Sequence, residues 1–185
     1  MRSTVIDVKA AQPYHVCIGS HLVPDIAELG STFRNVGIVY QKSVSTFVAD
    51  IAAALQSKGT NVHLFAVPDA EAGKTLVVAE ELWMSCGNAG ITRADAIMGV
   101  GGGAATDLAG FIASTWMRGI AFISCPTSLL GMVDAGVGGK TGINNAIGKN
   151  LIGTFHEPRG VFIDLSVLHT PVSYTHLTLP TIYSV

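Results

Sequence analysis

Short apolar runs and amphipathic stretches alternate along most of the chain. Residues 35–40 (NVGIVY) are typical of a buried strand, and residues 43–57 place apolar side chains on one helical face before Gly59 ends the pattern. A second strand-like run, residues 61–68, closes at Pro68. The pattern predicts a strand, a helix and a second strand in succession.

The same alternation continues towards the C-terminus, and two β-branched runs, residues 3–9 and 14–19, predict a pair of strands before it. The further predicted elements are a helix from residue 75 to about residue 86, a strand over 95–100, a helix over 104–116 and a strand over 120–124. Strands that alternate with helices of about ten to fifteen residues form parallel βαβ units. The sequence therefore predicts an α/β fold, with a Rossmann-like parallel sheet and flanking helices.

The composition narrows the class of protein. Of the 185 residues, 49% are hydrophobic and only 13% are charged, which excludes a long solvated tail. Eleven Lys and Arg against thirteen Asp and Glu give a net charge of −2, whereas surfaces that bind nucleic acid or anionic membranes carry a positive excess. We therefore expect no nucleic acid and no membrane among the partners.

The N-terminus and the cysteines favour a cytoplasmic protein. The segment MRSTVIDVKAAQ has neither the apolar core nor the cleavage site of a signal peptide, and the most apolar long stretch, residues 97–115, is interrupted by a charge. Cys17, Cys86 and Cys125 are far apart and in no CxxC spacing, so we expect buried thiols and no disulfide. The histidines are also spaced unlike metal ligands, so no metal site is predicted from the residues present.

Glycine and charge are distributed unevenly, which points to one region. Thirteen of the 21 glycines lie between Gly99 and Gly153, where the backbone is expected to turn sharply or approach a ligand closely. Charges in such a glycine-rich, apolar segment are expected to be partly buried and to have partners or a ligand. The five charged residues of positions 101–150 are Asp107, Arg118, Asp134, Lys140 and Lys149.

A glycine-rich segment, residues 99–111 (GVGGGAATDLAGF), follows a predicted strand and opens a predicted helix. Backbone amides at a helix N-terminus can hold a phosphate or pyrophosphate, which makes Gly102, Gly103 and Ala104 candidate contacts. The dinucleotide fingerprint GxGxxG/A is matched only formally, because no acidic residue follows about twenty positions on. The alternative is a tight turn in which Asp107 is a carboxylate of the first helical turn.

A second polar group, Asp69, Glu71 and Lys74, follows the predicted strand that ends at Pro68. Carboxylates at the carboxyl end of a parallel strand can bind ribose hydroxyls, and a lysine there can pair with a phosphate. The alternative is a solvated, charged loop before a helix.

Residues 125–155 contain a third group. Thr127 and Ser128 follow a predicted strand, while Lys140, Lys149 and Asn150 come from glycine-rich backbone. Two ammonium groups and an amide in one cleft would bind a phosphorylated, oxygen-rich substrate. The string GGKT is not a P-loop, because the position that needs glycine, residue 134, is aspartate. The alternative is a glycine-rich surface loop that carries lysines.

Three segments together resemble the 3-dehydroquinate synthase family. They are GGGAATDLAGFIASTWMRG, CPTSLLGMVDAGVGGKTGIN and GKNLIGTFHEP, in the family's order and spacing. The resemblance runs from about residue 3 to residue 170 and is most specific over residues 99–158. It implies an NAD-binding α/β domain over residues 1–170, followed in the family by a helical domain.

The resemblance also implies an activity. Family members are NAD-dependent lyases of the shikimate pathway that convert 3-deoxy-D-arabino-heptulosonate 7-phosphate into 3-dehydroquinate and phosphate. Bound NAD transiently oxidises a ring hydroxyl, and a divalent metal, zinc or cobalt, polarises that hydroxyl. The small phosphorylated sugar-acid is thus the expected partner, and a homodimer is expected for the whole protein.

Carried over position by position, the resemblance assigns residues to two sets. The cofactor set is Asp69, Glu71, Lys74, Gly102, Gly103, Ala104, Asp107, Thr127, Ser128, Lys140, Lys149 and Thr170. The catalytic and substrate set is Arg118, Asp134, Lys140, Lys149 and Asn150. Gln41 departs from the family, where many members carry an aspartate for the adenosine ribose, and Ser128 stands where threonine is commoner.

The resemblance stops after residue 170. Residues 171–185 match nothing in the family and are expected to be a foreign tail, and the family's three metal ligands belong to the helical domain that this sequence does not contain. His176 is not expected to replace them. By this interpretation the chain is an inactive NAD-binding fragment of a 3-dehydroquinate synthase.

Three other interpretations stay open. Another sugar-phosphate cyclase could share these motifs, because it uses the same chemistry. A metal-dependent polyol dehydrogenase shares the glycine-rich turn, but such enzymes usually continue with a Gly-Ser-Glu type string after the Pro-Thr pair, where this chain reads LLGMVDAGVGGKTGIN. A non-catalytic NAD-binding protein would bind the nucleotide without turnover.

Overall fold

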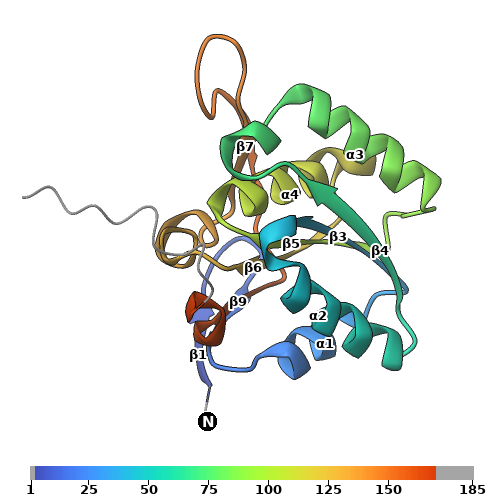
Figure 1. The fold of residues 1–185 in the computed structure, drawn as a ribbon, viewed down its shortest axis with the longest axis vertical. Coiled ribbons are helices and arrows are strands. Elements are labelled where there is room, and N and C mark those ends of the chain that lie inside the picture. Colours follow the sequence, from blue (N-terminus) through green and yellow to red (C-terminus); the bar gives the residue numbers. More distant parts are fainter. Residues whose placement is uncertain (1–2, 170–185) are drawn as a thin grey trace, which may run out of the picture.

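A seven-stranded sheet runs through the molecule in the order β1-β2-β9-β6-β5-β3-β4 (Figure 1). The structure is a computed structural model that describes residues 3–169. The strands are β1 (Thr4–Val8), β2 (Tyr14–Gly19), β3 (Asn35–Gln41), β4 (Asn61–Val67), β5 (Ala96–Gly101), β6 (Ala121–Pro126) and β9 (Gly160–Asp164). All neighbours are parallel except β1, which is antiparallel to β2 because a short loop around Pro13 joins them. The predicted α/β sheet is confirmed, with this one antiparallel edge.

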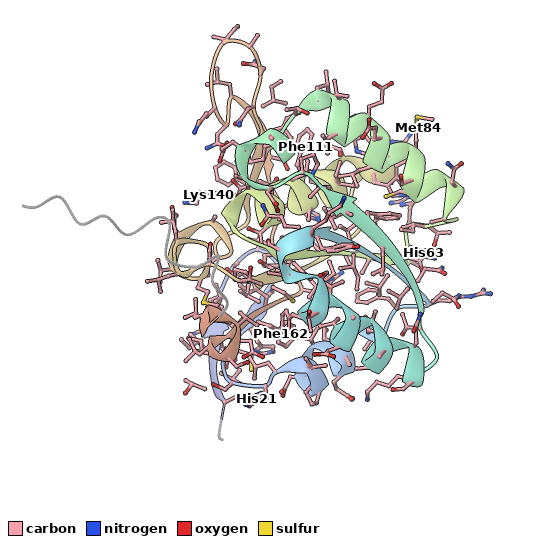
Figure 2. The ribbon with its side chains drawn as sticks, in the orientation of Figure 1. His21, His63, Met84, Phe111, Lys140 and Phe162 are labelled. Atoms are coloured by element: carbon pink, nitrogen blue, oxygen red, sulfur yellow. The ribbon has the colours of Figure 1, made fainter. Side chains whose placement is uncertain are left out.

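Two helices cover each face of the sheet (Figure 1). They are α1 (Val23–Gly30) and α2 (Ser45–Ser57) on one face, and α3 (Leu76–Asn88) and α4 (Gly103–Thr115) on the other. Side chains alternate across each strand, so Ile38 packs into the core beneath α1 and α2 while Val39 packs beneath α3 and α4. Figure 2 places Phe162 in the first layer and Phe111 in the second, whereas Met84 lies on the outer side of α3.

The order of the strands creates a crevice at one edge of the sheet. After β3 the chain forms β4 on one side, then crosses back to place β5 on the other side of β3. Parallel βαβ units bind ligands outside the carboxyl ends of the strands at such a reversal. Here those ends are Gln41 of β3 and Gly101 of β5.

A two-stranded hairpin of β7 (Lys140–Ile143) and β8 (Ile152–Phe155) lies outside the main sheet and packs on α4. A Cβ at Gly110 would lie 2.4 Å from the Thr141 side chain, so this glycine allows the close approach. The loop between the two strands projects from the body of the molecule (Figure 1, orange). This hairpin, α1 and β9 are not among the elements predicted from the sequence.

The cysteines are buried and free, as expected. Burial raises the pKa of Cys86 to about 12 and also raises the pKa of Cys17 and Cys125. In the described part of the chain, no helix is both long and apolar enough to cross a bilayer.

Candidate functional site

A cleft of about 740 Å³ lies at the reversal of the sheet, between the ends of β3, β4, β5 and β6. Most of the residues predicted to form a site line it, although they come from segments far apart in the sequence. They are Asp69, Glu71, Lys74, Gly102, Gly103, Ala104, Asp107, Thr127, Ser128, Asp134, Lys149 and Asn150. The fold therefore brings the three predicted polar groups together in one place.

The N-terminus of α4 faces this cleft, and its three glycines have different roles. Gly101 has a φ of 156°, a conformation that favours glycine. A Cβ at Gly103 would lie 2.9 Å from the Cβ of Ala135, so packing excludes a side chain there. At Gly102 the nearest atoms, on Gln41 and Ser128, would be 3.5 Å away, so the position has room for a Cβ.

No side chain caps α4 within the described residues, and Gly102, Gly103 and Ala104 at its N-terminus, the positive end of the helix dipole, line the cleft. Gln41 Oε1 accepts a hydrogen bond of 2.8 Å from the Gly102 amide and thereby joins the end of β3 to the start of α4. Such an uncapped N-terminus suits an anionic group. Gln41 was noticed in the sequence only as a departure from the family, although its place at the end of a strand indicates a cleft position.

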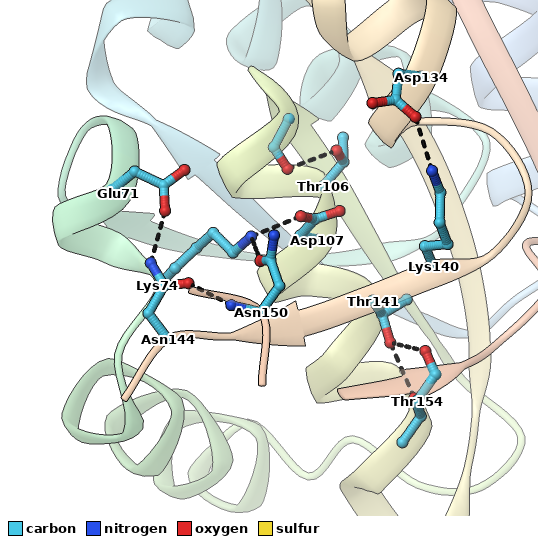
Figure 3. A network of polar contacts seen from close by, with 11 residues as sticks. Glu71, Lys74, Thr106, Asp107, Asp134, Lys140, Thr141, Asn144, Asn150 and Thr154 are labelled. Atoms are coloured by element: carbon cyan, nitrogen blue, oxygen red, sulfur yellow. Dashed lines mark hydrogen bonds and ion pairs between the residues drawn. The ribbon is translucent and has the colours of Figure 1, made fainter. Parts of the chain in front are cut away.

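A buried ion pair forms the floor of the cleft (Figure 3). The Lys74 side chain is only 2% exposed, and its Nζ lies 2.6 Å from Asp107 Oδ2 and 2.5 Å from Asn150 Oδ1. Burial raises the pKa of Asp107, and Lys74 opposes that rise. Because two buried charges need each other, Lys74 and Asp107 fix the short helix η2 (Ala70–Gly73) against α4.

The hairpin loop is bonded to the same helix η2. Asn144 Nδ2 donates to Glu71 Oε2 at 2.6 Å, and the Asn144 amide donates to the Lys74 carbonyl at 2.8 Å. Asn144 is not among the site residues predicted from the sequence, because its contact with Glu71 depends on how the hairpin loop folds against η2.

A second hollow of about 400 Å³ adjoins the first, and Asp107, Asp134 and Asn150 line both. Lys140 lines only this second hollow, where its Nζ lies 2.7 Å from Asp134 Oδ1. The hydrogen bond to Asp134 raises the pKa of Lys140. Both side chains are 58% exposed, so an anion could reach the ammonium group from solvent.

One predicted site residue within the described part of the chain, Arg118, is not brought to these hollows. Arg118 is exposed and follows the C-terminal end of α4, just before β6 begins, so it lies at the amino edge of the sheet and lines neither hollow. Its predicted role with substrate stays a prediction. Thr170, His176 and the predicted tail over 171–185 lie outside the described residues.

Over residues 3–169, no three His, Cys, Asp or Glu side chains are grouped so that they could hold a metal ion.

Residues 64–176 match the model of the family described as 3-dehydroquinate synthase N-terminal. Over 167 residues, the chain is 57% identical to a 3-dehydroquinate synthase of Corynebacterium efficiens, a match that covers 89% of this chain and 46% of that protein. The chain thus spans less than half the length of this relative.

Two solved structures have the same fold. A 2-deoxy-scyllo-inosose synthase complexed with carbaglucose-6-phosphate, NAD+ and Co2+ is 28% identical with a TM-score of 0.82, over 89% of this chain and 46% of that one. A 2-epi-5-epi-valiolone synthase from Streptomyces hygroscopicus with NAD+ and Zn2+ bound is 30% identical with a TM-score of 0.77, over 90% of this chain and 47% of that one. Both structures contain a nucleotide that a cleft of this kind could hold.

Proposed function

The chain belongs to the 3-dehydroquinate synthase family, and on that premise we propose that residues 1–170 form the NAD-binding domain of such an enzyme. The reaction proposed for the whole protein is conversion of 3-deoxy-D-arabino-heptulosonate 7-phosphate into 3-dehydroquinate and phosphate. The observation that carries the proposal is the convergence of the predicted polar groups on one cleft at the reversal of the sheet.

The cleft fits a dinucleotide. Its volume of about 740 Å³ is that of a ligand pocket, and the uncapped start of α4 offers amides to the pyrophosphate. Asp69 and Glu71, beyond the end of β4, would accept hydrogen bonds from ribose hydroxyls. Lys149 would add a positive charge near the phosphates. When bound, NAD would supply the transient oxidation of a substrate hydroxyl.

The second hollow is the place we propose for the phosphorylated sugar-acid. Lys140 would bind an anionic group there in exchange for part of its contact with Asp134, and Asn150 would orient hydroxyl groups. Because Asn150 and Asp107 line both hollows, substrate and nucleotide would lie side by side. Lys74 would keep Asn150 at this boundary.

The described residues do not fit a divalent metal, because they contain no group of ligands for one. The proposal therefore assigns none of residues 3–169 to the Co2+ or Zn2+ that the two neighbouring structures contain.

Other sugar-phosphate cyclases are the nearest alternatives. The neighbouring cyclases are 28% and 30% identical to this chain, against 57% for the 3-dehydroquinate synthase of Corynebacterium efficiens. The difference in identity favours the 3-dehydroquinate synthase reaction.

Calorimetric titration of the 185-residue chain with NAD tests the proposal. Gly102→Val should weaken binding at least about tenfold, because its side chain would enter the cleft at a position where the fold leaves room. The matched control is Gly87→Val on the exposed surface of α3, which should bind as the unchanged chain does. Equal affinity of the two variants, or no binding by the folded, unchanged chain, would contradict the assignment.

A further inference from the structure

Two adjacent asparagines begin the loop between β7 and β8, and they have different partners. Asn145 bonds only within the turn: its Oδ1 accepts from the amides of Ile147 at 2.9 Å and Gly148 at 3.0 Å. Its own amide donates to the Gly148 carbonyl at 3.1 Å. Asn145 therefore shapes the tip of the loop, and it is not among the described residues that line the cleft.

Asn144 bonds outside the turn, to both sides of the cleft (Figure 3). Its side chain donates from Nδ2 to Glu71 Oε2 at 2.6 Å and accepts at Oδ1 from the Asn150 amide at 2.9 Å. One half-buried amide group thus joins helix η2 to the far end of the loop.

Asn150 needs this support because its backbone is in the left-handed region, with a φ of 57°. In that conformation its Oδ1 reaches Lys74 Nζ, which also binds Asp107. The bond from Asn144 holds the amide of the strained residue. The direction of the Asn150 side chain, and the course of the neighbouring Lys149, thereby depend on a residue that does not line the cleft.

We propose that Asn144 is a positioning residue of the nucleotide site: it holds Asn150 and Lys149 over the cleft and fixes the carboxylate of Glu71. The inference rests on the proposed function, because NAD is the ligand whose affinity reports it. It also explains how one loop serves both hollows, since Glu71 lines the first and Asn150 lines both.

The first test compares Asn144→Ala with Asn145→Ala by calorimetric titration of the 185-residue chain with NAD. Asn144→Ala should raise the Kd about tenfold, because Asn150 loses its support and Glu71 loses a donor. Asn145→Ala, which removes a similar number of bonds from the same loop, should change the Kd less than about twofold. Circular dichroism checks that both variants are folded.

Asn144→Asp supplies a readout that a general loss of loop structure would not give. The new carboxylate can still accept the hydrogen bond from the Asn150 amide, but it places a second negative charge next to Glu71. Lys74 and Asp107 are the other titratable groups of the network. Two carboxylates in contact cannot both be charged, so one of them takes up a proton as the pH falls and then donates to the other. NAD affinity of this variant should therefore recover between about pH 8 and about pH 5, relative to the unchanged chain at each pH.

The outcomes separate the two proposals. If the folded, unchanged chain does not bind NAD, the proposed function of these residues fails. If it binds NAD, but Asn144→Ala and Asn145→Ala weaken binding equally or not at all, the inference about Asn144 is overturned. Asn144→Asp with an unchanged relative affinity at both pH values would also overturn it, even if Asn144→Ala does not fold.

Discussion

At the scale of single residues, Lys74 is unusual because a lysine side chain is seldom fully buried. It was predicted as one member of a charged loop, for which a solvated position was the alternative. The structure instead buries it against Asp107 and Asn150, because the loop folds under the hairpin. Sequence identifies the residue type and its place after a strand, but burial depends on the hairpin, which lies more than sixty residues away in the chain.

Lys74→Met should destabilise the fold by about 3–5 kcal/mol near neutral pH, because it leaves the Asp107 carboxylate buried without a partner. Burial already raises the pKa of Asp107 in the folded state, and the substitution removes Lys74, the main group that opposes that rise. A carboxyl with a raised folded pKa binds its proton more tightly when folded, so the loss should shrink as the pH falls through that pKa. Urea unfolding at about pH 8 and about pH 5 measures the difference.

The control for this substitution is Lys58→Met. Lys58 forms a 2.6 Å ion pair with Glu28, but both side chains are exposed, so the unfolding midpoint should hardly change. A loss for Lys74→Met that matches the control, or that grows as the pH falls, would contradict the role of the buried pair.

At the scale of elements, the long periodic segments could be predicted and the short ones could not. Helix α2 and strands β3, β4 and β5 follow the predicted ranges closely, because their apolar spacing reflects burial against the sheet. Helix α1 spans only eight residues, and β7 and β8 four each with glycine among them, so their patterns resembled loop. Those short elements are stabilised mainly by packing: α1 packs on the sheet, and β7 and β8 pack on α4.

The contact between α4 and β7 can be tested at Gly110. Gly110→Ala should destabilise the fold by about 1–3 kcal/mol, because its Cβ would lie 2.4 Å from the Thr141 side chain. Gly87→Ala, in exposed α3, should instead stabilise by about 0.5–1 kcal/mol through helix propensity. Chemical denaturation of both variants gives the two signs, and two changes of the same sign would contradict the packing argument.

The start of α1 depends on Asp164, the last residue of β9. Its carboxylate accepts from the amides of His21, Leu22 and Ser166 and from the Ser166 hydroxyl. Burial alone would raise the pKa of Asp164, but these hydrogen bonds from Ser166, Leu22 and His21 lower it below its usual value.

Asp164→Asn should therefore destabilise the fold by about 2 kcal/mol near neutral pH, since an amide cannot accept all of these bonds. A lowered folded pKa gives stability above the unfolded pKa that is lost as the pH falls through the folded value, so the two chains should converge in acid. Thermal unfolding of both chains from neutral pH to acid checks the convergence. A difference in stability that stays constant with pH would contradict a stabilising role for the Asp164 charge.

For the whole molecule, the residues that line the cleft could be predicted better than their division between the two hollows. Its lining residues follow strand ends, and strand ends in a parallel sheet share one edge, so sequence position is enough to group them. Lys140 is one example, because the resemblance put it in both the cofactor and the substrate sets, and in the structure it lines the second hollow but not the first. For Arg118 the same rule holds, because its place between the predicted helix over 104–116 and the predicted strand over 120–124 already puts it at the amino ends of the strands, opposite the cleft.

Lys140→Met should accordingly change NAD affinity by less than about twofold. It should weaken the binding of 3-deoxy-D-arabino-heptulosonate 7-phosphate by about tenfold or more, because the variant loses one charge-assisted contact with the substrate. Titration with each ligand in turn measures both affinities. Loss of NAD binding would show that the lysine belongs to the cofactor set instead.

The pairing of β2 with β9 has a consequence for how the protein assembles. His15 lies beside Gly160, so β2 is held in the sheet by β9, across nearly the whole described sequence. Closing so long a loop costs more conformational entropy than local pairing does, so this pairing forms more slowly. During synthesis on the ribosome, β1 and β2 must therefore wait beside an unfinished sheet until β9 emerges, and in that interval the open edges of β2 and β6 are available to chaperones or to other nascent chains.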